Sequence, residues 1–213
     1  MIPSDREIKL ALLRDFIRIS PPPADGAFSS MAVDLTLHEE ISIWQAQPET
    51  DAPVIVYPAR PKFSVIDLFD EHGTKVLLSS EGFILKPGAF ILGWTVEEIR
   101  LPHTSRLAGR VEGRSTLARL GLGVHVTAPT IHAGFGTTDD PEYPGTRIRL
   151  EIWNCGPLHV CLEKGMKICQ LILEEVHGTP EKGYEGVFAT QAPQGAPPVP
   201  TPSQPTPKKR RRR

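Results

Sequence analysis

The sequence is poor in cysteine, in aromatic residues and in long apolar runs, and each scarcity excludes a class of protein. Only 3 of the 213 residues are cysteine and no Cys-x-x-Cys pair occurs, so we expect no disulfide framework and a reducing, cytoplasmic location. No run approaches the roughly 20 apolar residues that cross a bilayer, and no apolar signal segment opens the chain, so we expect no membrane partner. The composition, 39% hydrophobic and 23% charged, is that of a soluble folded protein. We expect the three cysteines to be buried small apolar side chains: Cys155, Cys161 and Cys169.

Excess positive charge is confined to the C-terminus. Six basic residues end the chain at 208–213, and the other 207 residues carry a net charge of −7. This acidic body lacks the basic face with which nucleic-acid-binding proteins neutralise phosphates. Residues 194–213 are rich in proline, and we expect a disordered tail whose basic end is the one candidate for nucleic-acid binding. Residues 1–193 are predicted to form one domain.

Short runs of alternating or apolar residues predict a protein built mainly from β-strands. One short helix is predicted from Ser4 to about Phe16, because Ser4 and Glu7 have the spacing of a capping box. A second is predicted at 115–120, and no other. In chain order, the predicted strands are 33–37, 54–57, 75–78, 83–85, 90–99, 123–127, 147–153, 158–162 and 167–173. Many short strands with frequent turns predict an antiparallel barrel or sandwich.

The predicted strand 147–153 carries an acidic side chain on its less apolar face. Its three isoleucine and leucine residues share one face, and Glu151 projects from the other with Arg149 and Trp153. Without further information, a glutamate in this position is most often an ordinary solvated residue.

The segment Gly113–Leu122 has residue types that suit an anion. Arg114 offers a planar set of N–H donors that matches phosphate oxygens, and Ser115 and Thr116 supply hydroxyl and N–H groups at a helix start. Arg119 follows about one helical turn later. The alternative interpretation is an N-capped helix with two solvated arginines.

Together these segments resemble the signature of the dCTP deaminases, a branch of the trimeric dUTPase superfamily. Residues 113–122 read GRSTLARLGL, and the VHVTA block, a Gly-aromatic turn and a Leu-Glu pair follow at 124–128, 134–135 and 150–151. Further similar blocks lie at 4–5, 33–35, 85–90 and 165–171. The resemblance covers roughly residues 4–191. It implies a distorted jelly-roll-type β-barrel of the dUTPase-like fold, assembled as a homotrimer with active sites between subunits.

The resemblance implies hydrolytic deamination of dCTP to dUTP and ammonia, which supplies dUTP for thymidylate synthesis. Glu151 would act as the base on the attacking water. The Ser115 hydroxyl and the Ala128 carbonyl would hold that water, and Arg119 would keep Glu151 ionised and oriented. Arg114, Ser115 and Thr116 would bind the phosphates.

The resemblance also assigns nucleotide-contacting positions nearer the C-terminus and on the strand of the catalytic glutamate. These are His132, Arg149, Leu150, Lys182, Tyr184 and Gln191. His132 stands where the family usually has an aspartate that contacts the sugar hydroxyl. A neutral imidazole can still hydrogen-bond a hydroxyl, but it lacks the fixed charge that a base for pyrophosphate hydrolysis would have.

Expected cofactors and effectors follow from the same comparison of motifs. The H-x-E…P-C-x-x-C pattern of zinc-dependent deaminases is absent, so we expect no zinc and no metal bound by protein residues alone. Magnesium is expected to bind through the substrate triphosphate. Thymidine triphosphate (dTTP) is an expected inhibitor that favours an inactive arrangement of the loop 124–127. Two alternatives stay open: a bifunctional enzyme that forms dUMP and pyrophosphate, and a non-catalytic nucleotide-binding regulator.

Overall fold

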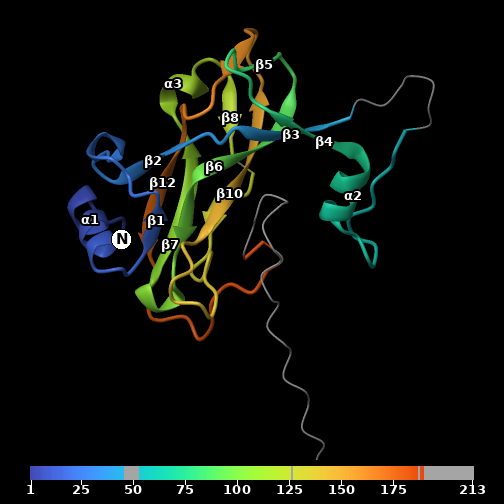
Figure 1. Cartoon of the computed structure of the whole chain (residues 1–213). Coiled ribbons are helices and arrows are strands. Elements are labelled where there is room, and N and C mark those ends of the chain that lie inside the picture. The colour runs from blue at the N-terminus through green and yellow to red at the C-terminus, as the bar shows by residue number, and fades with distance from the viewer. Residues whose placement is uncertain (46–52, 126, 187, 190–213) are drawn as a thin grey trace, which may run out of the picture.

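The structure is a computed structural model that describes residues 1–45, 53–125, 127–186 and 188–189 (Figure 1). Within these ranges the chain forms 12 β-strands, three short α-helices and two 3-10 turns, Asp25–Ala27 and His103–Ser105. The prediction of a mainly β protein is therefore confirmed. None of the helices in these ranges is long and apolar enough to cross a membrane. The boundary at residue 193 and the tail 194–213 lie outside the described residues and stay predictions.

Two larger sheets and one strand pair make up the β structure. The six-stranded sheet has the order β4-β3-β6-β10-β8, and β1 pairs with the C-terminal half of β6. Its strands are β1 Arg18–Ser20, β3 Glu40–Trp44, β4 Gly73–Leu77, β6 Phe90–Arg100, β8 Leu122–Val124 and β10 Thr146–Asn154. The four-stranded sheet, in the order β2-β12-β7-β9, contains β2 Ala32–Thr36, β7 Leu107–Gly113, β9 Thr130–Ile131 and β12 Lys167–Glu175. The remaining pair is β5 Phe83–Leu85 with β11 Val160–Leu162.

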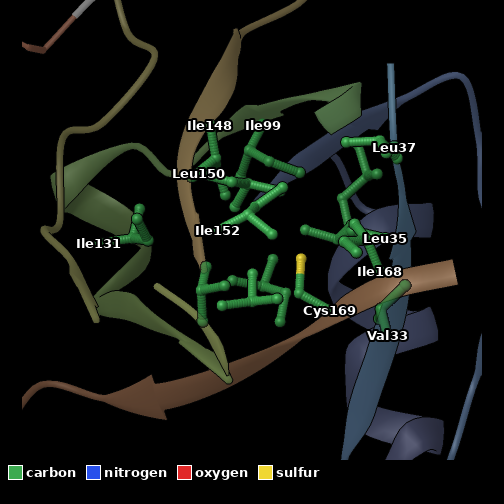
Figure 2. Packing of buried hydrophobic residues seen from close by; sticks show 14 of the residues in the cluster. Val33, Leu35, Leu37, Ile99, Ile131, Ile148, Leu150, Ile152, Ile168 and Cys169 are labelled. Carbon is green, nitrogen blue, oxygen red and sulfur yellow. The ribbon is translucent and has the colours of Figure 1, made fainter. Parts of the chain in front are cut away.

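The hydrophobic core lies between the two larger sheets (Figure 2). Leu35 of β2 and Ile168 of β12 face Leu150 and Ile152 of β10, and all four are fully buried. Beyond β2 the chain passes to the six-stranded sheet, where Leu37 pairs with a residue of β6. Strand pairing within the described ranges does not close into one continuous barrel, so the jelly-roll-type fold is built as two packed sheets.

Strand β10 shows the alternation that its sequence predicts. Every second residue from Thr146 to Asn154 is buried, and the residues between them are partly exposed. Leu150 therefore lies in the core and Glu151 on the outer face, because successive side chains of a strand point to opposite faces.

The helix at the N-terminus is confirmed, and it ends earlier than expected. Helix α1 spans Asp5–Leu13, and both the backbone N–H and the hydroxyl of Ser4 donate to the Glu7 carboxylate at 2.6 Å. The second predicted helix is also present, as the single turn α3, Ser115–Ala118.

The prediction for the region between β3 and β4 is wrong. Residues 53–57 form no strand, and the four residues Val54–Tyr57 are between 41% and 65% exposed. An unpredicted helix, α2, spans Val65–His72 and begins where the Ser64 hydroxyl accepts a hydrogen bond from the Asp67 N–H at 3.1 Å. The β-branched pair Val65–Ile66 at its start favours a strand by propensity, whereas the capping hydroxyl of Ser64 favours the start of a helix.

Four strands of the structure were not predicted: β1, β3, β7 and β9. Strand β7 contains two glycines, and glycine within a segment usually argues against the prediction of a strand. A Cβ atom at Gly109 would lie 2.8 Å from a side-chain carbon of Leu171 in the adjacent strand β12. The glycine therefore permits close packing inside the sheet, which only the pairing of the strands reveals.

The expectation of buried cysteines holds for one of the three. Cys169 is fully buried in the core, and this burial raises the pKa of its thiol. Cys155 and Cys161 are exposed. Cys161 lies between two buried residues of the short strand β11 and therefore points outward, and Cys155 directly follows the last residue of β10.

Candidate functional site

Glu151 projects from the outer face of β10 and is held by the residue that follows β8. Strand β8 pairs with β10, and the backbone N–H of His125 donates to the carbonyl of Glu151 at 2.8 Å. The side chains also meet, with the Nδ1 atom of His125 2.7 Å from the Oε2 atom of Glu151. The imidazole is almost buried and the carboxylate side chain is 29% exposed. The carboxylate is thus both anchored and reachable from solvent.

His125 adopts a backbone conformation that is costly for a non-glycine residue. Its φ is +52°, in the left-handed region that side chains with a Cβ rarely occupy. Such conformations persist where the surroundings over-determine them, and they concentrate at functional sites. His125 belongs to the VHVTA block, but no pattern in the sequence predicts a role for it, because only the pairing of β8 with β10 brings it to Glu151.

Arg149 lies on the same face as Glu151 and is enclosed by aromatic rings. It is the direct cross-strand neighbour of Trp94 in β6, and its guanidinium carbon lies 4.4 Å from the Trp94 ring centroid. The Phe69 ring of α2 lies 5.9 Å from the same carbon. Burial lowers the pKa of Arg149 to about 10, although the negative charges of Glu40 and Glu151 act in the opposite direction. The structure therefore places this predicted nucleotide-binding residue between the sheet and α2.

Arg114 directly follows β7 and forms an ion pair with an aspartate of the same sheet. Its Nη1 atom lies 2.6 Å from Asp34 of β2, and the Lys167 ammonium lies 2.9 Å from the other oxygen of that carboxylate. The amide of Gln170 donates to Asp34 at 3.1 Å. Burial raises the pKa of Asp34, but the hydrogen bonds and charges of Lys167 and Arg114 outweigh it, so the pKa lies below its usual value.

The other predicted catalytic residues, Ser115, Arg119 and Ala128, lie outside the strand that carries Glu151, as does the predicted phosphate-binding residue Thr116. Ser115 and Thr116 open the exposed turn α3, Arg119 ends it, and Ala128 is also exposed. In the part of the chain that the structure describes, no side-chain hydrogen bond or ion pair joins any of these residues to Glu151. Among the described residues, these predicted groups therefore form two sets that no side-chain hydrogen bond or ion pair connects.

Two of the predicted nucleotide-binding residues do come together. The imidazole of His132 and the ring of Tyr184 are stacked, with centroids 4.7 Å apart and planes 17° from parallel. The Tyr184 N–H donates to the carbonyl of Ala133 at 3.0 Å. Lys182 lies nearby in the chain, with its ammonium 3.4 Å from Glu185. The structure thus seats part of the C-terminal segment on the turn that carries His132.

Two predicted positions contribute no side chain to this surface. Leu150 is fully buried in the core, so it can contact a nucleotide only through its backbone. Gln191 lies outside the described residues. Across residues 1–45, 53–125, 127–186 and 188–189, no three His, Cys, Asp or Glu side chains gather as a metal site.

Comparisons with known proteins agree on one family. The family model described as dCTP deaminase-like matches residues 2–176. A dCTP deaminase from Rhodospirillum rubrum is 36% identical, over 85% of this chain and 86% of its own. A "dCTP deaminase, dUMP-forming" from Methanosphaera stadtmanae is 33% identical, over 85% of this chain and 82% of its own. The crystal structure of a 2′-deoxycytidine 5′-triphosphate deaminase from Agrobacterium tumefaciens has a similar fold, with a TM-score of 0.59 and 18% identity. That match covers 82% of this chain and about half, 48%, of the other.

Replacing Asp34 with Asn is expected to lower the free energy of unfolding at pH 7 by roughly 1–3 kcal/mol. The reason is that the amide leaves Arg114 and Lys167 without their shared counter-charge. Because the pKa of Asp34 is lowered in the folded protein, its stabilising contribution is fully present above its ordinary pKa, near 4. It is lost as the pH falls through the lower folded-state value. Urea unfolding should therefore show that the difference in the free energy of unfolding between wild type and variant becomes smaller as the pH falls below about 4.

The matched control is Asp25→Asn, because the Asp25 side chain is 99% exposed beside Lys9. An exposed ion pair contributes little, so this variant should change stability by less than about 1 kcal/mol. If the difference in the free energy of unfolding between wild type and Asp34→Asn stays constant from neutral to acid pH, this result would contradict the assigned role of the Asp34 charge.

Proposed function

Because the chain belongs to the dCTP deaminase-like family, we propose that it hydrolyses dCTP to dUTP and ammonia. The observation that carries the proposal is the anchored, reachable carboxylate of Glu151. It stands at the position that the sequence resemblance assigns to the base. The His125 backbone N–H donates to the main-chain carbonyl of Glu151, and the His125 imidazole lies against the carboxylate, with Nδ1 2.7 Å from Oε2. A carboxylate placed in this way can accept a proton from water and deliver it within a site.

The reaction needs one group that moves protons between water and the base ring. Glu151 takes a proton from water as the water oxygen bonds to C4 of the cytosine. The electron pair of the C4–N3 double bond moves to N3, which receives that proton from Glu151. The second proton of the water then passes to the amino group, the C4–N bond breaks, ammonia leaves and the C4 carbonyl forms.

We attribute activation of the water to the carboxylate and not to zinc. The support is the sequence, which lacks the cysteine pattern that holds zinc in other nucleobase deaminases. Magnesium would be bound by the triphosphate of the substrate, where it offsets the phosphate charge, and Arg114, Ser115 and Thr116 would contact the phosphates.

We propose that the site is completed between the subunits of a homotrimer. Ser115 begins the turn α3 and Arg119 directly follows it, whereas Glu151 belongs to β10, and no hydrogen bond or ion pair among the described residues joins them. A cyclic assembly brings one surface of each subunit against a different surface of its neighbour, which can unite two such half-sites. Arg119 of one subunit would then orient Glu151 of another.

The product distinguishes two forms of this activity. Relatives of this chain include proteins named dCTP deaminase and proteins named dCTP deaminase, dUMP-forming. We favour dUTP, because His132 lacks the fixed negative charge that a base for pyrophosphate hydrolysis would have. Free dUTP supports this choice, dUMP with pyrophosphate supports the bifunctional alternative, and unchanged dCTP supports a non-catalytic regulator.

Replacing Glu151 with Gln should lower kcat for deamination by at least about 100-fold, because the amide cannot accept a proton from water. Binding of dCTP should stay within a few-fold of wild type. The measurement follows ammonia release and separates the nucleotides, in buffer that contains magnesium and a zinc chelator. The control is Glu163→Gln, an exposed glutamate after β11, which should leave the rate unchanged. Deamination by Glu151→Gln within a few-fold of wild type would remove this residue from the role of base.

Mixed subunits test whether the site is shared. Chains with Glu151→Gln and chains with Arg119→Ala should each be inactive alone. In trimers formed from equal amounts of both, about a quarter of the sites would combine an intact Glu151 from one chain with an intact Arg119 from its neighbour. These sites would recover activity. No recovery after mixing, with trimers present, would place both residues of each site in the same chain.

Inhibition by dTTP tests the proposed regulation of the loop 124–127. A ligand that prefers an inactive arrangement shifts the population of the whole oligomer, so inhibition should be cooperative and the substrate dependence sigmoidal. The measurement is dCTP deamination at rising dTTP concentrations and fixed magnesium. Hyperbolic, purely competitive inhibition would indicate that dTTP only occupies the substrate site.

A further inference from the structure

The ring stack between His132 and Tyr184 joins two segments that are far apart in the sequence. His132 directly follows β9, and Tyr184 lies in the C-terminal segment after β12. Their rings overlap at a centroid distance of 4.7 Å and an interplanar angle of 17°. Stacked rings are stabilised beyond the burial of their area, so this pair favours one arrangement of the two segments.

The backbone around the stack is shaped to receive the C-terminal segment. The Tyr184 N–H donates to Ala133 at 3.0 Å, and the N–H of Gly136 donates to the carbonyl of Ala189 at 2.9 Å. Gly134 has a φ of +99°, and a Cβ atom there would collide with the backbone nitrogen of Tyr184. A Cβ atom at Gly186 would collide with the Tyr184 ring. Both glycines therefore allow a close approach that a side chain would block.

We propose that His132 is a positioning residue whose ring seats Tyr184 and so holds the C-terminal segment on the turn 132–136. The proposal rests on the proposed function for its effect on substrate, since that segment is expected to contact the nucleotide. It gives His132 a role that differs from hydrogen bonding to the sugar. Stacking requires a flat ring at position 132, whereas hydrogen bonding requires a polar atom there.

Two substitutions separate these roles. His132→Phe keeps a ring and removes the polar atoms, and His132→Asp keeps polar atoms and removes the ring. If the ring seats Tyr184, His132→Phe should keep the KM for dCTP near the wild-type value. His132→Asp and His132→Ala should raise it by about two- to tenfold, the range that an aromatic pair contributes. The kcat of all three should stay within about twofold of wild type, because none removes the proposed base.

Two controls show that the effect comes from this pair. The exposed His159, before β11, provides the matched substitution, and His159→Ala should leave KM unchanged. In a double-mutant cycle, Tyr184→Ala alone should raise KM, and adding His132→Ala should raise it little further, because the stack is already lost. Full additivity of the two substitutions would overturn the coupling between the rings.

Limited proteolysis tests whether His132 holds Tyr184 in place, and this test does not require enzyme activity. Trypsin cleaves after Lys182, directly before the seated residues, and it also cleaves after the exposed Lys62 between β3 and β4. Cleavage after Lys182 should be about two- to tenfold faster in His132→Ala and His132→Asp than in wild type and His132→Phe. Cleavage after Lys62 should be equal in all four proteins.

The outcomes are distinct. A KM that His132→Asp preserves and His132→Phe raises would overturn the proposal in favour of hydrogen bonding to the sugar. Equal KM values and equal cleavage after Lys182 in every variant would overturn it as well. If wild type does not deaminate dCTP, the proposed function fails, and the cleavage rates alone decide whether His132 seats Tyr184.

Discussion

The pairing of β10 with β6 on one side and β8 on the other is the constraint on which the candidate site depends. Because the side chains of a strand alternate, a shift of one residue in this register would turn Glu151 into the core and Leu150 out of it. The burial of Leu150 against the second sheet makes such a shift costly. The same register places Trp94 of β6 opposite Arg149 and brings His125 next to the Glu151 carboxylate. Core packing on one face of the strand therefore sets the geometry on the other.

The second sheet carries the other half of the proposed site and is stabilised differently. Arg114 follows β7, and its guanidinium is bound to Asp34 of β2, next to Lys167 of β12. A carboxylate that is almost buried needs such partners, because an unpaired charge there would be strongly destabilising. The ion pairs thus join three strands of the sheet at the point from which Ser115 and its neighbours begin. The proposed phosphate-binding turn α3 thus connects β7 of this sheet with β8, which pairs with the strand that carries Glu151.

The sequence predicted those features that local patterns determine. Strict alternation identified β10 and the face of Glu151, and the pair Ser4–Glu7 located the first helix, because both signals act within a few residues. The helix α2 was missed, and a strand was wrongly predicted at 54–57, because apolar content alone does not show whether a partner strand exists. The contact of His125 with Glu151 depends on strand pairing, and no local pattern announces it. The same holds for the stack of Tyr184, which lies 52 positions after its partner in the chain.

Electrostatics gives a reason for a ring at position 132. The body of the protein carries a net charge of −7, and a triphosphate substrate adds further negative charge, so binding depends on local positive groups and magnesium. Two of the predicted nucleotide-binding cations are already partly neutralised, since Arg114 faces Asp34 and Lys182 faces Glu185. An aspartate at position 132 would add another negative charge to this region. A stacked imidazole can hold the C-terminal segment through dispersion and ring geometry without adding negative charge. A histidine at this position, where the resemblance would lead one to expect an aspartate, is therefore consistent with the acidic character of residues 1–207, because a stacked ring adds no negative charge to that field.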